Sequence, residues 1–255
     1  MSTAPDPGTA TRAEIVATAI ADTFRDDREI LASPIGLLPG VGARLAKLTT
    51  SPQLLFSDGQ AYGAIDPWSK DPAIESWISY RTVFDIVASG KRHVMMGANQ
   101  IGRWGDQNLN ALGDPARPAR QLLGMRGAPG NTANHTTSYW IARHSARVFV
   151  EPVDTVSGIG YRRAAEAGTG ATRFHQLRHV VTNLAVLDFE TPDHSMRLRS
   201  VHPWSSVDEV VEQTGFALVV PDDVPVSRAP TAEELRLIRE VVDPRGTRDS
   251  EVPPA

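Results

Sequence analysis

The sequence predicts an α/β fold in which an open, mixed and mostly parallel β-sheet is flanked by helices. Apolar and β-branched runs near residues 53–57 and 92–96 are separated by a helical segment, and strands joined through a helix pair in parallel. Residues 179–203 contain two further runs joined by Thr-Pro-Asp-His, which predicts a local antiparallel hairpin. The 255 residues are enough for one such domain with a large core.

Capping signals position the helices. Thr11, Ser206 and Thr231 each precede a glutamate by three residues and an apolar stripe by a few more, the pattern of a capping box at a helix start. Two more helices are expected over residues 39–50 and 76–89, the second ending before a glycine.

The predicted strands follow the apolar runs in chain order. They are 53–57, 92–98, 139–144, 147–153, 179–190, 195–203 and 216–220. Both ends of the chain are rich in Pro, Gly and charge. We therefore expect a flexible tail at 1–10, a single domain over 11–243 and a second flexible tail at 244–255.

Composition excludes several functions. Hydrophobic residues make up 41% of the chain and charged residues 22%, with a net charge of -4, so the chain is globular and announces no basic surface for nucleic acid. Without cysteine it has no disulfide, thiolate metal site or cysteine nucleophile. No apolar run reaches the roughly 20 residues that span a bilayer, and the first residues lack a secretory pattern. We expect a cytoplasmic protein that binds no membrane.

Glycine-rich segments after predicted strands are the most informative region. Residues 95–108 carry Gly97, Gly102 and Gly105, and residues 122–135 carry Gly124, Gly127 and Gly130. Each segment alone is typical of a turn, and neither fits a dinucleotide or phosphate-loop pattern. Together with the strand-end Ser-Asp-Gly at 57–59, they can meet at the carboxyl edge of a parallel sheet, where α/β proteins bind ligands.

Four motifs in one order resemble a known family. Residues 49–63 (TTSPQLLFSDGQAYG), 97–108 (GANQIGRWGDQN), 124–131 (GMRGAPGN) and 147–161 (RVFVEPVDTVSGIGY) are similar to motifs in β subunits of family I CoA-transferases, of the glutaconate and 3-oxoacid types. The resemblance covers about residues 12–220 and implies the NagB/RpiA/CoA-transferase-like fold. It also implies an α partner, in a heterodimer or a heterotetramer of two α and two β chains.

Three positions depart from the transferase pattern. Asp58 stands where transferases carry the glutamate that forms a CoA thioester, and its side chain is one methylene shorter. A displacement of about 1 Å can cost a nucleophile roughly a hundredfold in rate. Arg126 replaces a glycine beside the implied oxyanion position, and Gly102 replaces an aspartate. A guanidinium at 126 is suited to a carboxylate, enolate or oxyanion.

The departures resemble most the branch of the family that hydrolyses a steroid-derived ring. That resemblance implies a β subunit of a CoA-transferase-like hydrolase that opens the last ring of a cyclic keto-acyl-CoA in a retro-Claisen reaction. The principal base would be a glutamate of the α partner, Arg126 would serve the oxyanion, and Asp58 would be secondary. CoA would be part of the substrate, with no bound cofactor. The implied pocket residues are Ser57, Gly97, Asn99, Gln100, Trp104, Asn108, Gly124, Gly127, Asn131 and Asn134.

Other interpretations stay open. The chain could be a true CoA-transferase subunit that tolerates aspartate, or a non-catalytic subunit or ligand sensor. Asp58 could be an ordinary strand-end turn residue, and Arg126 half of an ion pair. His135 and His144 lack the spacing of a metal site. His175 and His179 are four residues apart but lack the central glutamate of the zinc-protease motif, so we expect no metal.

Overall fold

The computed structural model describes residues 10–56, 62–64, 74–77, 79–89 and 91–252. Contacts group these residues into two units, and the single domain expected over 11–243 stays a prediction. Unit 1 comprises the described residues up to Asp85, together with 91–96 and those from Ser227 onward. Unit 2 comprises 86–89 and 97–226. The first and last parts of the chain therefore share one unit, which a linear sequence pattern does not reveal.

Three parallel strands form the sheet of unit 1. They are β1 (Leu31–Pro34), β2 (Leu55–Phe56) and β5 (Arg92–Met96). β1 pairs in parallel with both neighbours, with Leu31 opposite Leu55 on one side and Arg92 on the other. The predicted parallel orientation of β2 and β5 is confirmed. However, β1, which the sequence analysis did not predict, lies between them.

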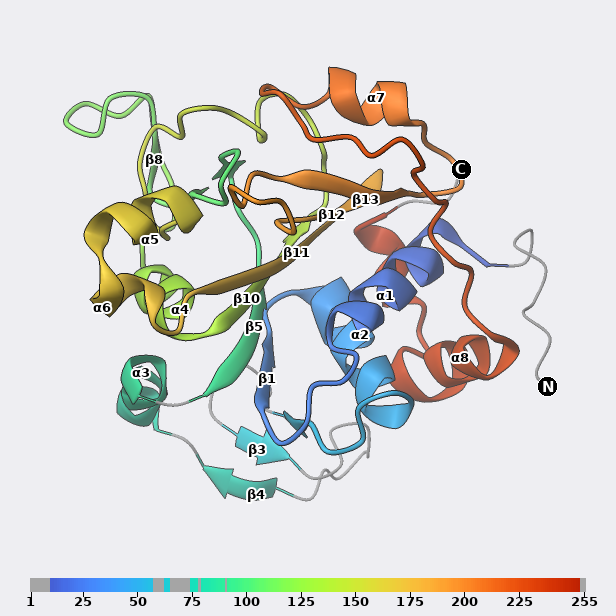
Figure 1. Ribbon diagram of the computed structural model, residues 1–255. Coiled ribbons are helices and arrows are strands. Elements are labelled where there is room, and N and C mark those ends of the chain that lie inside the picture. Colours follow the sequence, from blue (N-terminus) through green and yellow to red (C-terminus); the bar gives the residue numbers. More distant parts are fainter. Residues whose placement is uncertain (1–9, 57–61, 65–73, 78, 90, 253–255) are drawn as a thin grey trace. The chain divides into compact units, whose positions relative to one another are not determined.

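Helices of unit 1 come from both ends of its sequence. They are α1 (Arg12–Thr23), α2 (Leu37–Leu48), α8 (Ala232–Arg236), the π-helix η2 (Leu237–Val242) and the 3-10 helix η3 (Thr247–Ser250). α1 packs on α2, and the C-terminal helices lie against them (Figure 1). A Cβ on Gly42 would lie 2.3 Å from a methyl carbon of Ile20, so glycine permits this close approach. The capping boxes at Thr11 and Thr231 are both present.

Residues 244–252 differ from the expected flexible tail. Arg248 is 6% exposed and its Nη2 donates to Glu14 Oε1 over 2.7 Å. The carboxylate of Glu251 accepts from the backbone N–H of Leu38 at 3.2 Å, and Val252 is buried. The charged residues that suggested a solvated tail instead contact α1, through Arg248, and α2, through Glu251.

The segment before β5 begins its helix later than predicted. β3 (Tyr62–Ala64) and β4 (Ile74–Trp77) form an antiparallel pair, and α3 covers Tyr80–Ser89. The first residues of the helix expected over 76–89 thus belong to a strand. Backbone pairing with β3 overrides the helical pattern there.

Unit 2 contains a mixed set of four longer strands. They are β10 (Thr136–Ile141), β11 (Gln176–Thr182), β12 (Ala185–Asp188) and β13 (Arg197–Val201). β10 and β11 are parallel, whereas β11–β12 and β12–β13 are antiparallel. The hairpin predicted across Thr-Pro-Asp-His is confirmed as β12–β13. The run 179–190 contains two strands rather than one, because Thr182 Oγ1 accepts the N–H groups of Leu184 and Ala185 and closes a turn.

Short elements complete unit 2. They are β6 (Gln100–Ile101), β7 (Gln107–Asn108), β8 (Ala111–Leu112), β9 (Arg120–Gln121), α4 (Ala128–Asn134), α5 (Tyr161–Ala167), α6 (Thr169–Thr172) and α7 (Val207–Glu212). The strands predicted over 147–153 and 216–220 make only isolated bridges, Ile101 with Phe149 and Arg197 with Val219. Prolines 152 and 221 lack the N–H that would continue a ladder.

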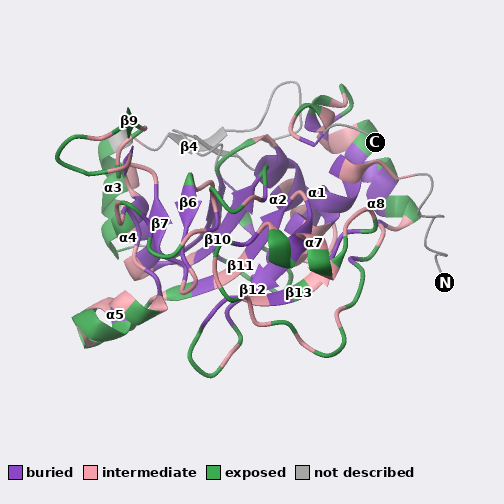
Figure 2. Cartoon of the chain, turned by 90° about the horizontal axis from the view of Figure 1, so that it is seen from above, coloured by how far each residue is buried: buried purple, intermediate pink, exposed green. Residues whose placement is uncertain are grey.

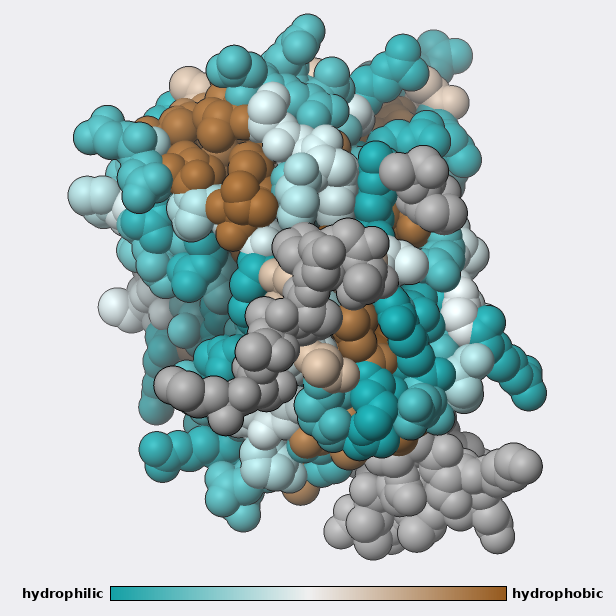
Figure 3. Space-filling model, turned by 90° about the vertical axis from the view of Figure 1, so that its right-hand side faces the viewer, coloured by the Kyte–Doolittle hydropathy of each residue, from teal (hydrophilic) through white to brown (hydrophobic). Residues whose placement is uncertain are grey.

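Buried residues are concentrated on α1 and α2 and on strands such as β5, whereas α5 is largely exposed (Figure 2). Most of the face drawn in Figure 3 is hydrophilic, with hydrophobic residues gathered in a few patches. No helix among the described residues is both long enough and apolar enough to cross a membrane.

Two buried histidines of unit 2 are held in the neutral form. His144 stacks on Phe149 with ring centroids 3.9 Å apart, and its ring nitrogens contact the hydroxyls of Thr182 and Thr214 at 3.2 and 3.0 Å. Burial lowers the pKa of His144 from 6.5 to about 3. Burial also lowers the pKa of His202 to about 4. Each site excludes the proton that the unfolded chain would bind.

Stability should therefore fall on acidification below pH 6.5. The unfolded state takes up protons on both histidines below that pH, whereas the folded state does so only near the lowered pKa values. The free energy of unfolding should be level above about pH 6.5 and fall by up to about 1.4 kcal/mol per pH unit for each histidine. Urea unfolding between pH 8 and 5 measures this slope, and His144→Gln should reduce it. An unchanged slope in that variant would contradict the assignment.

Candidate functional site

The segment after β5 folds into the β6–β7 hairpin, and two predicted pocket residues hold it closed. Gln100 Nε2 donates to Asp154 Oδ2 at 3.1 Å, and its Oε1 accepts from Asn108 Nδ2 at 2.8 Å. The same Nδ2 donates to Ala111 O at 2.7 Å. Gln100 and Asn108 are both buried. In this chain their amides join the hairpin to the 150–160 segment, which brings two of the four motifs together.

Gln107 is a residue of this site that the motif analysis missed. Its side chain is buried and Nε2 donates to Gly97 O at 2.6 Å. Its backbone exchanges hydrogen bonds with Gly158 at 2.9 and 3.1 Å. Its Oε1 is buried and accepts no hydrogen bond from the described residues. Gln107 thus positions the Gly97 backbone, a role that only its buried amide, and no sequence motif, reveals.

The turn of the hairpin is locked to α5. Asp106 Oδ1 accepts from Gly160 N at 2.7 Å, and Oδ2 accepts from Arg163 Nε at 2.9 Å. A Cβ on Gly160 would lie 2.3 Å from the carbonyl oxygen of Trp104. Glycine is required here because the two backbones touch. Gly160 therefore allows the 147–161 segment to pack directly on the hairpin turn.

Trp104 lies at this turn, close to two guanidinium groups. The Cζ atoms of Arg103 and Arg162 are 5.0 and 4.3 Å from its ring centroid. Cation–π contacts of this kind stabilise a partly exposed indole. A contact between Trp104 and a substrate stays a prediction.

A second loop carries Arg126 to the surface. The Leu123 loop (residues 122–127) turns at Gly124, where φ is +88°, and is tied down by Gly124 N donating to Leu109 O at 3.1 Å. Arg126 itself has φ of +49°, an uncommon value for a residue with a side chain. Its side chain is exposed, and Nε reaches Leu123 O over 3.4 Å. Within the described ranges no carboxylate pairs with it, so the ion-pair interpretation finds no partner there.

Gly127 precedes α4, whose polar residues face inward. Asn134 Nδ2 donates to Val87 O at 3.1 Å, and the His135 ring contacts the same oxygen at 3.1 Å. Asn131 is buried. These side chains attach α4 to the end of α3 within unit 2. Of the asparagines predicted to line a pocket, Asn99 alone is exposed.

The structure therefore divides the predicted site residues into two groups. Gln100, Asn108 and Asn134 make hydrogen bonds that shape the loops, whereas Asn99 and Arg126 present their side chains to solvent. Ser57 and Asp58 lie outside the described residues. Between Pro115 and Val150 the sequence contains no Asp or Glu but five arginines, whereas Asp114 and Glu151 adjoin this stretch.

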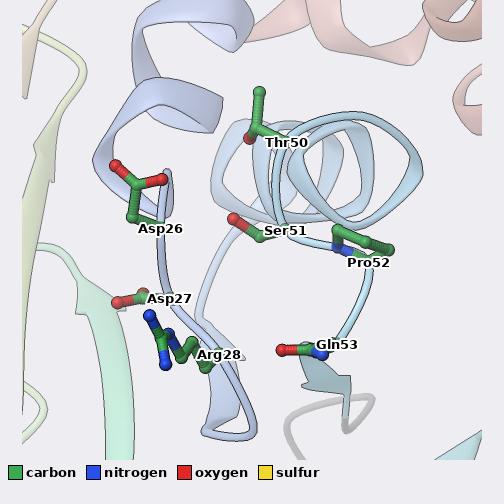
Figure 4. A pocket seen from close by; sticks show the side chains of 7 residues that line it. All are labelled: Asp26, Asp27, Arg28, Thr50, Ser51, Pro52 and Gln53. Atoms are coloured by element: carbon green, nitrogen blue, oxygen red, sulfur yellow. The ribbon is translucent and has the colours of Figure 1, made fainter.

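A separate pocket of unit 1 contains none of the predicted residues (Figure 4). Its volume is about 270 Å³ and it is lined by Asp26, Asp27, Arg28, Thr50, Ser51, Pro52 and Gln53. Asp27 Oδ2 lies 2.5 Å from His93 Nδ1, and Ser51 donates to Phe24 O at 2.7 Å. The pocket lies before β1 and β2 begin, whereas parallel sheets bind ligands where strands end. It is therefore a poor candidate for the substrate site.

Proteins of known function are similar to this chain over nearly its whole length. No protein-family model matches the chain. The chain is 54% identical over 245 residues to the "Cholesterol ring-cleaving hydrolase IpdB subunit" of Rhodococcus jostii (strain RHA1), covering 95% of this chain and 96% of that protein. It is 27% identical to a 3-oxoadipate CoA-transferase subunit of Pseudomonas knackmussii, over 79% of this chain and 82% of that protein.

A solved structure has the same fold. The crystal structure of Rhodococcus jostii RHA1 IpdAB superposes with a TM-score of 0.91 at 52% identity, over 96% of this chain and 99% of that chain. The predicted mixed α/β fold and the resemblance to CoA-transferase β subunits are both confirmed. On identity over nearly its full length, the chain belongs to the family of cholesterol ring-cleaving hydrolase IpdB subunits.

Proposed function

We propose that this chain is the β subunit of a hydrolase that, with an α partner, opens the last ring of a steroid-derived cyclic keto-acyl-CoA. The observation that carries the proposal is the 54% identity across 95% of the chain to a ring-cleaving hydrolase subunit. The likeness to a CoA-transferase subunit, at 27% identity, is more distant. It supports a shared thioester-binding fold and a changed reaction.

The proposed reaction is a hydrolytic carbon–carbon cleavage of the retro-Claisen type. Water, deprotonated by a base of the α partner, adds to the ring ketone and forms a tetrahedral oxyanion. The oxyanion collapses to a carboxylic acid as the ring bond to the neighbouring carbon breaks. The electron pair passes to that carbon, which takes up a proton. The net change is the addition of one water, and the CoA thioester stays intact.

Arg126 is the group of this chain best suited to the oxyanion. Its guanidinium is exposed on a loop that Gly124 and two backbone hydrogen bonds hold in shape. A guanidinium offers several N–H donors and keeps its charge at any physiological pH. Donors placed before the charge develops stabilise the transition state more than mobile water does. In this proposal Asp58 has a secondary polar role and forms no covalent intermediate.

Isotope labelling with covalent trapping tests the proposal. The assembled complex is incubated with a steroid-derived cyclic keto-acyl-CoA in ¹⁸O-water, with and without borohydride. One ¹⁸O should enter the new carboxylate, and no modified carboxylate should appear on this chain. A glutaconate-type CoA-transferase run in parallel supplies the positive trapping signal. A trapped adduct at Asp58, or CoA exchange between two acids without hydrolysis, would instead establish a transferase.

A further inference from the structure

The Leu123 loop carries two exposed apolar side chains beside Arg126. Leu123 is 71% exposed and Met125 is 39% exposed. Exposed leucines are ordinary singly, but these two lie on a loop that is held in one shape. Leu122 N donates to Asn110 O at 2.8 Å and Gly124 N to Leu109 O at 3.1 Å. The apolar groups are thus displayed by a fixed backbone.

We infer that Leu123 and Met125 are a docking anchor for the α partner subunit. This inference rests on the proposed function, in which an α-chain base and Arg126 act on one substrate. An α chain that approaches Arg126 must also cover the residues immediately before it. The buried core of a protein interface is more apolar than the rest of the surface, and Met and Arg are among the residue types enriched there.

The exposure of Leu123 favours a protein over a small molecule as the occupant. Small-molecule sites are concave and enclose most of their ligand. A side chain 71% exposed stands above its surroundings and fits a groove on another protein. Met125, two residues along the same loop, is less exposed at 39%.

Charge complementarity agrees with a partner of acidic character. In the sequence, Arg120 precedes Leu123 by three residues and Arg126 directly follows Met125. An α chain that brings a catalytic carboxylate to this surface would face these cations. Complementary charge sets the orientation of docking, and apolar burial supplies affinity.

Dissociation of the assembled complex on dilution, followed by mass photometry, tests the anchor. Leu123→Ala should weaken the complex by about tenfold to a hundredfold, and Leu123→Asp by more. Phe174→Ala is the matched control, because Phe174 is 58% exposed in the same unit and lies outside the anchor. It should dissociate as the wild type does.

Two results would overturn the anchor. One is unchanged dissociation of Leu123→Asp with a raised KM for the acyl-CoA, which would assign Leu123 to the substrate. The other is equal weakening by Phe174→Ala, which would mean that no specific anchor exists. Association is measured without turnover, so the anchor and the proposed function can fail separately. If Leu123→Asp weakens a complex that catalyses another reaction, the anchor is supported and the proposed hydrolysis is refuted.

Discussion

Replacing Arg126 by alanine should lower kcat of the assembled complex by about a hundredfold to a thousandfold, the usual cost of removing one oxyanion donor. The substitution takes away a charge that no described acid compensates, so the folded state loses little. Thermal unfolding should stay within the range of ordinary surface substitutions, about 0.5 kcal/mol. Steady-state kinetics at saturating α partner measure the loss.

Two further variants make this result specific. Arg126→Lys keeps the charge without the planar fork of donors and should recover only part of the rate. Arg143→Ala removes an exposed arginine of the same unit and should leave kcat unchanged. Wild-type turnover in Arg126→Ala would favour a non-catalytic subunit.

Replacing Glu14 by alanine should have the largest effect on stability, about 3–5 kcal/mol. Glu14 is fully buried. Its carboxylate accepts from Arg239 at 2.8 and 2.9 Å and from Arg248 at 2.7 Å. Without it, Arg248 keeps only the contacts with Asp243, and a largely buried cation is under-compensated. Urea unfolding followed by tryptophan fluorescence measures the loss.

An exposed ion pair supplies the control. Glu233 Oε1 and Arg236 Nη2 are 2.6 Å apart on the surface of α8, and exposed ion pairs of this kind contribute little to stability. Glu233→Ala should therefore be nearly neutral. If Glu14→Ala and Glu233→Ala lower the free energy of unfolding equally, the buried contacts of Glu14 with Arg239 and Arg248 are not the source of stability.

The pH dependence of the Glu14 contribution has a definite sign. Burial opposes ionisation, but hydrogen bonds from Arg239 and Thr11 and the charge of Arg248 outweigh it, so the pKa of Glu14 lies below its ordinary 4.5. The contribution is fully present above the unfolded pKa. It is lost as the pH falls through the lowered folded value.

Local sequence was enough for much of the fold. The capping boxes at Thr11 and Thr231 were readable because donor and acceptor are three residues apart. The β12–β13 hairpin was readable because its strands are adjacent in the chain. The four ordered motifs identified the family and predicted the loops of the candidate site.

Contacts between distant residues decided the rest. The sequence analysis predicted no strand at β1, which pairs in parallel with β2 on one edge and with β5 on the other. Residues 244–252 are rich in charge, yet they are ordered because Arg248 meets Glu14, 234 positions away. No local pattern encodes a partner at that separation.

Contacts between distant residues also decide which residues of the candidate site are buried and which are exposed. Sequence identified the polar residues of the two glycine-rich segments, and it predicts that Arg126 serves the oxyanion. It did not separate Gln100 and Asn108, whose amides are consumed in the hairpin, from Asn99 and Arg126, whose side chains stay exposed. The sequence shows the same side-chain type whether it holds the hairpin together or faces solvent. Only the tertiary structure assigns the role, because the assignment depends on which distant backbone or side chain lies within hydrogen-bonding distance.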